Sequence, residues 1–287
     1  MERSDWKRIE SCVRALEEPR LGGRFDFSDA DIVLTFVWAC YFEKPMRWAC
    51  RRSSWPVYHR RPIPGESTMS RRMRTVRVQR LLEAARVALE DAGLGGFVRV
   101  IDGKVLAIAS HSVDPDAHFG GVRGRRRGYE LHSICTLGGE RQSWEARSLA
   151  EDERVVAREL IERTDAFGYL LGDSNYDGSE LGERCLRRGL QLVAPRKKPG
   201  RGLGHHPIGP ARRRSLEMIE FAPTEFSKDL LRQRRSIETM HANLVSAGGG
   251  LHGLPSWVRR LHRVRNWVAG KLLLDAARRN ALRAKRG

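Results

Sequence analysis

The sequence predicts an α/β fold, in which a mixed sheet flanked by helices is preceded by a small helical region. From residue 97 onward, β-branched apolar runs and helical stretches follow one another in the order β-β-β-α-β-α-β. Before residue 93, apolar residues recur at the three-to-four spacing of helices. The 287 residues, 40% of them hydrophobic, suffice for one large core or two modest ones.

The charge of the chain indicates its class of partner. It carries 53 Lys and Arg against 35 Asp and Glu, a formal net charge of +18. Such a charge creates a positive field that attracts polyanions, so nucleic acid is the expected partner. A basic surface that serves only solvation is the alternative.

The cysteines and the apolar runs exclude several classes. Five cysteines, odd in number and without CxxC spacing, argue against a disulfide framework or a zinc module. No apolar run approaches the ~20 residues that cross a bilayer, and the first residues lack a signal-peptide pattern. We therefore expect a cytoplasmic protein without a membrane partner. The cysteines are Cys12, Cys40, Cys50, Cys135 and Cys185.

Two helices are expected in the N-terminal region. Residues 28–42 form an amphipathic pattern with Ser28 or Asp29 as the cap. Residues 66–93 form a second, with Ser67 or Thr68 as the cap and Gly93 at its end.

Arginines crowd the first half of this second helix, among them Arg71, Arg72 and Arg74. Cations near a helix N-terminus are unfavourable because they oppose the helix dipole. Phosphates bound alongside the helix would explain why arginines are found there. A solvated basic face is the alternative. Residues 1–93 are thus predicted to be a helical DNA-binding region.

The strand-rich region carries acids where the chain should be apolar. Asp102 interrupts the run 97–109, and Asp173 directly follows the buried run that begins at Gly168. The expected strands are 97–109, 129–137, 141–150, 168–173 and 190–196, with helices at 153–165 and 179–189.

A third acid, Glu238, lies in the helical pattern 228–249. Three acids brought together repel one another unless cations neutralise them, and two Mg²⁺ ions (or Mn²⁺ in their place) suit carboxylate ligands and phosphoryl transfer. Alternatively, Asp102 and Gly103 form a hairpin turn, for which Asp-Gly is a strong signal.

Several segments together resemble the DDE transposases of bacterial insertion sequences. They read VIDGKVLAIASH, YLLGDSNYDGSELGERCLRRG, RRSIETMHANL and LPSWVRRLHRVRNW. The resemblance spans residues 97–275 and implies an RNase H-like catalytic domain whose triad is Asp102, Asp173 and Glu238. It also implies double-stranded DNA as the partner, cleavage of transposon ends and their transfer to target DNA, and a dimer in the synaptic complex. Residues 276–287 are expected to be a basic tail.

Two positions depart from the pattern of that family. In many relatives an Arg lies four residues before the catalytic Glu, a Tyr lies three residues before that Arg, and a Lys lies seven residues after the Glu. Arg234 and Glu238 match, whereas Leu231 and Val245 do not. A degenerate or domesticated transposase that only binds DNA, or an RNase H-like nuclease, therefore remains an alternative.

Other basic residues are predicted to contact DNA, and 196–214 is expected to be a basic loop that clamps it. His111 and Asp114 are candidates for an active-site loop, although an Asp before Pro is also ordinary turn chemistry. Asp177 is expected to cap the following helix, and Pro255 to begin the last one. The predicted contacts are Arg125, Arg126, Arg127, Lys197, Lys198, Arg234 and Arg235.

Overall fold

The computed structural model describes residues 3–19, 26–59, 61–90, 96–109, 111–120, 126–165, 167–199, 207–246 and 250–285. The chain forms two compact units: unit 1 is Met1–Ala92 with Asn243–Gly287, and unit 2 is Gly93–Ala242. The expected boundary near residue 93 coincides with this division. Residues 243–275, however, belong to unit 1 rather than to the strand-rich unit, and so does the predicted tail from 276.

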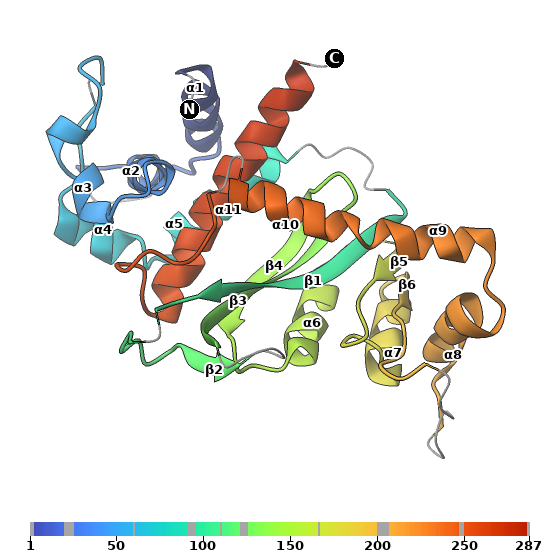
Figure 1. Ribbon diagram of the computed structural model, residues 1–287. Coiled ribbons are helices and arrows are strands. Elements are labelled where there is room, and N and C mark those ends of the chain that lie inside the picture. The colour runs from blue at the N-terminus through green and yellow to red at the C-terminus, as the bar shows by residue number, and fades with distance from the viewer. Residues whose placement is uncertain are drawn as a thin grey trace. The chain divides into compact units, whose positions relative to one another are not determined.

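Unit 1 is helical (Figure 1). A short 3₁₀ turn, Arg52–Ser54, follows its third helix. Its helices are α1 (Arg3–Ala15), α2 (Asp29–Tyr41), α3 (Met46–Ala49), α4 (Glu66–Arg72), α5 (Val76–Leu89) and α11 (Leu261–Ala284).

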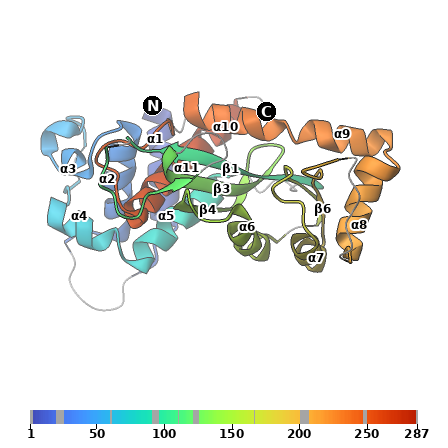
Figure 2. The same ribbon diagram turned by 60° about the horizontal axis from the view of Figure 1, so that its bottom comes forward.

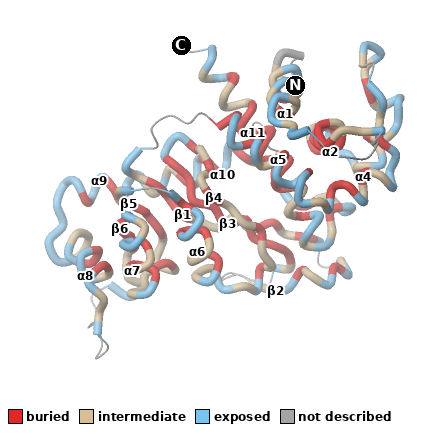
Figure 3. The backbone as a smooth tube through the Cα atoms, turned by 180° about the vertical axis from the view of Figure 1, so that it is seen from behind, coloured by how far each residue is buried: buried red, intermediate tan, exposed pale blue. Residues whose placement is uncertain are grey.

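Helix α2 is the buried centre of unit 1. Ser28 caps it as predicted, in a capping box with Asp31. The helix is not amphipathic, because almost every residue from Asp29 to Cys40 is buried, as its colouring in Figure 3 shows. Its first residue, Asp29, is itself buried and paired with the Arg72 and Arg77 side chains. The other helices of unit 1 therefore surround α2.

The second predicted helix breaks into α4 and α5. The Thr75 hydroxyl donates a hydrogen bond to the Arg72 carbonyl oxygen (2.8 Å), and Thr75 takes an extended conformation. Gly65 precedes α4, so Ser67 and Thr68 do not cap it, and Gly93 lies outside the described residues. Arg71 now lies in the last turn of α4, where cations favour the helix dipole. The dipole therefore no longer argues for phosphates here.

Helix α11 begins at Leu261, later than the predicted start at Pro255. Arg260 before it has a φ of 73°, which no helix accommodates. The fully buried Val264, Val268 and Leu272 lie along α11, which packs against α5 and α2. Residues 276–284 continue this helix, with Ala276, Ala277 and Ala281 buried, so the expected basic tail is helical for most of its length.

Unit 2 contains the sheet and the helices that cover it. Its strands are β1 (Val98–Ala107), β2 (His118–Gly120), β3 (Arg126–Thr136), β4 (Arg141–Ser148), β5 (Gly168–Leu171) and β6 (Leu190–Val193). Its helices are α6 (Glu153–Glu162), α7 (Ser179–Arg187), α8 (Pro210–Leu216) with a π-helical turn at Glu217–Phe221, α9 (Glu225–Gln233) and α10 (Ser236–Ser246), the last ending in unit 1.

The sheet is mixed. Its main order is β4-β3-β1-β5-β6, with β4, β3 and β1 antiparallel and β1, β5 and β6 parallel. The short β2, which the sequence did not predict, pairs with the first residues of β3. The mixed α/β class and, apart from β2, the order of strands and helices along the chain agree with the sequence prediction.

Helices cover both faces of this sheet (Figure 2). On one face, α6 and α7 pack against Ile101, Ile134 and Leu170. On the other, α9 and α10 pack against Val100, Cys135 and Leu171. This alternation along β1 follows from the two-residue period of a strand, and it assigns Asp102 to the α9 and α10 face.

Four local predictions for unit 2 are wrong. β1 continues through Asp102 and Gly103, so these residues form no hairpin turn. The pattern 228–249 breaks at Arg234 and Arg235 into α9 and α10. The expected loop 196–214 contains most of α8, which Pro210 begins. Asp177 does not cap α7, because its carboxylate accepts two hydrogen bonds from Arg212 instead.

All five cysteines are free thiols, as expected for a chain without a disulfide framework. Within the described ranges, no helix combines the length and the apolar character needed to cross a bilayer.

Candidate active site

Asp102 and Asp173 lie at matching positions of two neighbouring parallel strands. Val100 of β1 pairs with Leu171 of β5. Asp102 lies two residues after Val100, and Asp173 lies two residues after Leu171. Both are half-buried. The carboxyl ends of parallel strands are where α/β sheets place their ligand sites, and here β1 continues beyond its parallel partner with Asp102 in its interior. The sequence therefore located two acids correctly relative to each other.

A third carboxylate, Glu153, lies next to Asp173. The Asn175 backbone N–H donates to Asp173 Oδ1 (2.7 Å), and the Asn175 side chain donates to Oδ2 (3.4 Å). The same side chain is a hydrogen-bond partner of Glu153, the first residue of α6. The sequence analysis missed Glu153, because an acid in the first turn of a helix is ordinary capping chemistry.

The fourth carboxylate is Glu130 of β3. Its Oε1 lies so close to Gly103 that a side chain at position 103 would make the Glu130 carboxylate shift. The glycine beside Asp102 therefore leaves room for Glu130 in its present position. An acid within the apolar run YELHSI was the available sequence signal, the same signal that pointed to Asp102.

Burial and mutual repulsion make these acids reluctant to ionise. Burial, together with the charges of Asp173 and Glu153, raises the pKa of Asp102 to about 6, although the Gly103 N–H and Arg234 lower it in part. Burial also raises the pKa of Glu130 to about 7, with repulsion from Glu153, Asp102 and Asp173. The four carboxylates therefore form one electrostatic cluster, which we call the acidic cluster.

The Tyr176 hydroxyl faces the acidic cluster. The side chain is 1% exposed, and its hydroxyl has no hydrogen-bond partner within the described part of the chain. Burial and the charges of all four carboxylates raise its pKa above the usual value. A buried hydroxyl without a partner is uncommon and marks a position where a water or a ligand is bound.

Glu238, the third predicted acid, makes no described interaction with the acidic cluster. It is exposed in the first turn of α10, and its carboxylate makes no hydrogen bond or ion pair with any residue that the structure describes. One turn further along α10, His241 Nδ1 lies 3.8 Å from Asp102 Oδ2. Burial, then Arg141 and Lys104, lower the pKa of His241 to about 4, so the ring is neutral at pH 7.

The donor atoms fit a hard divalent cation, although their arrangement is incomplete. Carboxylate oxygens are the preferred ligands of Mg²⁺. The pKa of Asp102 is raised chiefly by burial and then by the neighbouring acids Asp173 and Glu153, a repulsion that a bound cation would relieve. Among the described residues, no three His, Cys, Asp or Glu side chains are grouped to hold one metal ion. Asp102 and Asp173 are therefore the ligands that the geometry favours.

Two of the predicted DNA-contact arginines stabilise the fold instead. Arg72 is buried and paired with Asp29, with Nη2 2.6 Å from Oδ1. The Arg127 guanidinium donates to the carbonyl oxygens of Ser112, Asp114 and Ala117. Neither is free to contact a phosphate, contrary to the prediction. Asp114 is likewise structural, because its Oδ2 accepts a hydrogen bond from the Tyr129 hydroxyl (2.7 Å).

The other predicted contacts remain available. Arg234 is half-buried and lies close enough to Asp102 to lower the pKa of that carboxyl. Arg125 lies outside the described residues. The exposed ones are Arg71, Arg74, Arg126, Lys197, Lys198 and Arg235.

The raised pKa values predict how the stability of unit 2 depends on pH. In the folded state Asp102 and Glu130 hold protons more tightly than in the unfolded chain, with pKa values of about 6 and about 7. Their contribution is complete below the ordinary values near pH 4 and is lost as the pH rises through 6 and 7. We expect the contribution of these two acids to the free energy of unfolding to fall over this window in metal-free buffer, while the buried His132 and His241, whose pKa values are lowered to about 4, contribute in the opposite direction.

Urea unfolding followed by far-UV circular dichroism measures this decrease. Asp102→Asn, which removes one of the two titrating groups, should make the decrease smaller. A pH dependence between 4 and 7 that is the same in both proteins would contradict the raised pKa of Asp102, because the contributions of the histidines are common to the two.

The acidic cluster, His241 and Arg234 together make up the candidate site. No protein-family model matches this chain, and no curated protein sequence matches it.

Proposed function

We propose that this chain is a DDE transposase of the bacterial insertion-sequence type, which cleaves the ends of its DNA element and joins them to target DNA. The observation that carries the proposal is the placement of Asp102 and Asp173 two residues beyond paired positions of parallel strands. The net charge of +18 supports a polyanionic substrate.

The topology of unit 2 is compatible with the RNase H-like domain that the sequence resemblance implies. Antiparallel strands β4, β3 and β1 adjoin parallel strands β5 and β6, and helices cover both faces. Asp102 lies on the central strand of this order, and the segment that begins with Asp173 follows the neighbouring strand. Glu238 begins the helix whose next turn reaches Asp102 through His241.

In the proposed reaction, Asp102 and Asp173 hold divalent metal and Glu238 completes the triad when DNA is bound. Bound Mg²⁺ supplies charge neutralisation for the attacking and leaving oxygens of an in-line phosphoryl displacement. The neutral His241 beside Asp102 adds no charge that would compete with metal for this carboxylate. The exposed Lys197 and Lys198, which follow β6, are suited to bind backbone phosphates next to the cluster.

A strand-transfer assay tests the proposal. The purified chain is incubated with Mg²⁺, DNA ending in the inverted repeats that flank its gene, and a target plasmid. We expect products in which the 3′-hydroxyl of the element end is joined to target DNA. Ends that are cut but never joined indicate the nuclease alternative, and intact ends with retained DNA binding indicate the non-catalytic one.

Two features favour the alternative of a protein that binds DNA without catalysis. Glu238 is exposed without contacts to described residues, and the positions of Leu231 and Val245 lack the Tyr and Lys of relatives. A protein that had lost catalysis but kept its basic surface would bind element ends without cutting them.

Comparing Glu238→Gln with Glu153→Gln identifies the third acid. If Glu238 joins the two aspartates on DNA, Glu238→Gln lowers the cleavage rate by about 10²-fold or more, and Glu153→Gln has a smaller effect. The measurement is the single-turnover rate of end cleavage. The opposite order would assign the third ligand to Glu153, and full activity of both variants would exclude a triad.

A further inference from the structure

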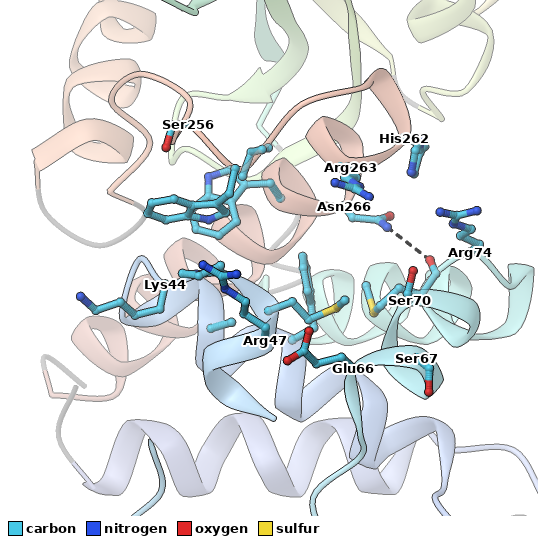
Figure 4. A pocket seen from close by; sticks show the side chains of 18 residues that line it. Lys44, Arg47, Glu66, Ser67, Ser70, Arg74, Ser256, His262, Arg263 and Asn266 are labelled. Atoms are coloured by element: carbon cyan, nitrogen blue, oxygen red, sulfur yellow. Dashed lines mark hydrogen bonds between the residues drawn. The ribbon is translucent and has the colours of Figure 1, made fainter. Parts of the chain in front are cut away.

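Unit 1 contains a pocket that the proposed catalytic site does not use. It has a volume of about 740 Å³ and lies among α2, α3, α4 and the start of α11 (Figure 4). This is within the range of pockets that bind small molecules or single groups of a larger ligand. The Asn266 side chain donates to the Met73 carbonyl oxygen (3.2 Å) and fixes one wall.

The lining of the pocket is aromatic and apolar. Phe36, Met73 and Trp267 are buried side chains of its wall. Trp257 also lines it and is 39% exposed, so part of its indole surface is accessible to a ligand. A large, partly exposed aromatic ring in a pocket is a platform on which another planar group can stack.

Positive side chains lie at both ends of the pocket. Lys44 and Arg47 lie at one end, and Arg74 and Arg263 at the other (Figure 4). All four are exposed, and the structure describes no ion pair for any of them. Glu66 is the acidic residue in the described lining. The pocket therefore combines an apolar middle with two cationic ends.

We propose that this pocket binds one unstacked nucleotide of single-stranded DNA, with its base on Trp257. The phosphates on either side of that nucleotide would then be held by the Lys44 and Arg47 pair and by the Arg74 and Arg263 pair. Single-strand binding sites combine base stacking on aromatic side chains with a positively charged path for the backbone. An acidic peptide would satisfy the cationic ends but has no flat group for the indole.

This binding goes beyond the proposed reaction, because it involves neither the acidic cluster nor a metal ion. It can therefore be tested in EDTA with DNA that lacks any element end. The probe is a fluorescein-labelled oligothymidylate of about eight nucleotides, and its partner carries abasic sites at the central positions with the same number of phosphates. Fluorescence anisotropy gives the dissociation constant of each.

We expect Trp257→Ala to weaken binding of the intact oligonucleotide about 5- to 100-fold, the range for loss of one stacked base. The wild-type protein should bind the abasic partner more weakly by a similar factor, and Trp257→Ala should bind the two probes alike. Trp257→Phe, which keeps a ring, should retain most of the affinity. This cycle isolates the contact between ring and base from the charge of the backbone.

Arg187→Ala is the matched control for charge, because it removes one exposed positive charge, on α7 of unit 2, that does not line the pocket. It should leave both dissociation constants within about twofold. Equal affinity of the wild type for intact and abasic DNA would overturn the proposal, as would unchanged binding by a folded Trp257→Ala protein. Capture of an acidic peptide with no difference between the two DNA probes would assign the pocket to protein binding.

Discussion

Asp102→Asn and Asp173→Asn are each expected to lower the rate of strand transfer by about 10³-fold or more. Each substitution keeps the shape of the side chain and removes one of the anionic oxygens that would hold metal. A bound metal contributes several kcal/mol of transition-state stabilisation, and about 1.4 kcal/mol corresponds to a factor of ten. The measurement is the single-turnover rate of end joining at saturating DNA.

DNA binding distinguishes loss of chemistry from loss of structure. Both variants should bind element ends as tightly as the wild type in EDTA, because the predicted phosphate contacts come from basic side chains. Asp229→Asn is the matched control, since Asp229 is exposed on α9 and pairs with Arg232 at 2.9 Å. Full strand transfer by either active-site variant would mean that the assigned aspartates do not carry the reaction.

Asp29→Ala is expected to destabilise unit 1 by about 3–5 kcal/mol. The Asp29 carboxylate is 2% exposed and lies 2.6 Å from Arg72 Nη2 and 3.1 Å from Arg77 Nε. Its removal leaves the buried Arg72 guanidinium without this counterion, and breaking a buried pair from one side has a cost in this range. Urea unfolding followed by tryptophan fluorescence measures the change.

The distribution of tryptophan makes this signal specific for unit 1, since Trp144 alone belongs to unit 2. Glu18→Ala serves as the control, because Glu18 is exposed and lies 3.8 Å from Arg77. It should change the free energy of unfolding by less than about 1 kcal/mol. Similar effects of the two substitutions would contradict the importance of burial for the Asp29 pair. The unit 1 tryptophans are Trp6, Trp38, Trp48, Trp55, Trp257 and Trp267.

Local patterns predicted the elements of this fold better than their ends. The alternation of β1 and the capping residue Ser28 are encoded within a few neighbouring residues, and both predictions hold. The break at Thr75 and the late start of α11 at Leu261 are not visible in such local patterns. The first depends on the hydrogen bond from the Thr75 hydroxyl to a backbone carbonyl oxygen, and the second on the positive φ of Arg260. Apolar periodicity continues across both places and conceals them.

The sequence predicted residues of the candidate site only where an acid stands within or directly after an apolar run. Asp102 interrupts an apolar strand and Asp173 ends one, so both were visible in the sequence. Glu153 looks like an ordinary first-turn acid, and it joins the cluster only because α6 starts near Asp173. Whether a cation such as Arg72 is free also depends on tertiary contacts, here with Asp29. Such pairings connect residues too distant in the chain for a local pattern to record.

Unit 1 consists of two stretches of chain separated by the whole of unit 2. Arg8 of α1 donates a hydrogen bond to Asn280 of α11, 272 residues later, and the buried Val264 and Leu272 come from that last helix too. During synthesis, the apolar surface of the early helices therefore stays exposed until α11 has been synthesised. The residues of the sheet unit are continuous in the chain, so nearly all of them are available for folding earlier. The part of the protein that emerges first is thus the part that matures last.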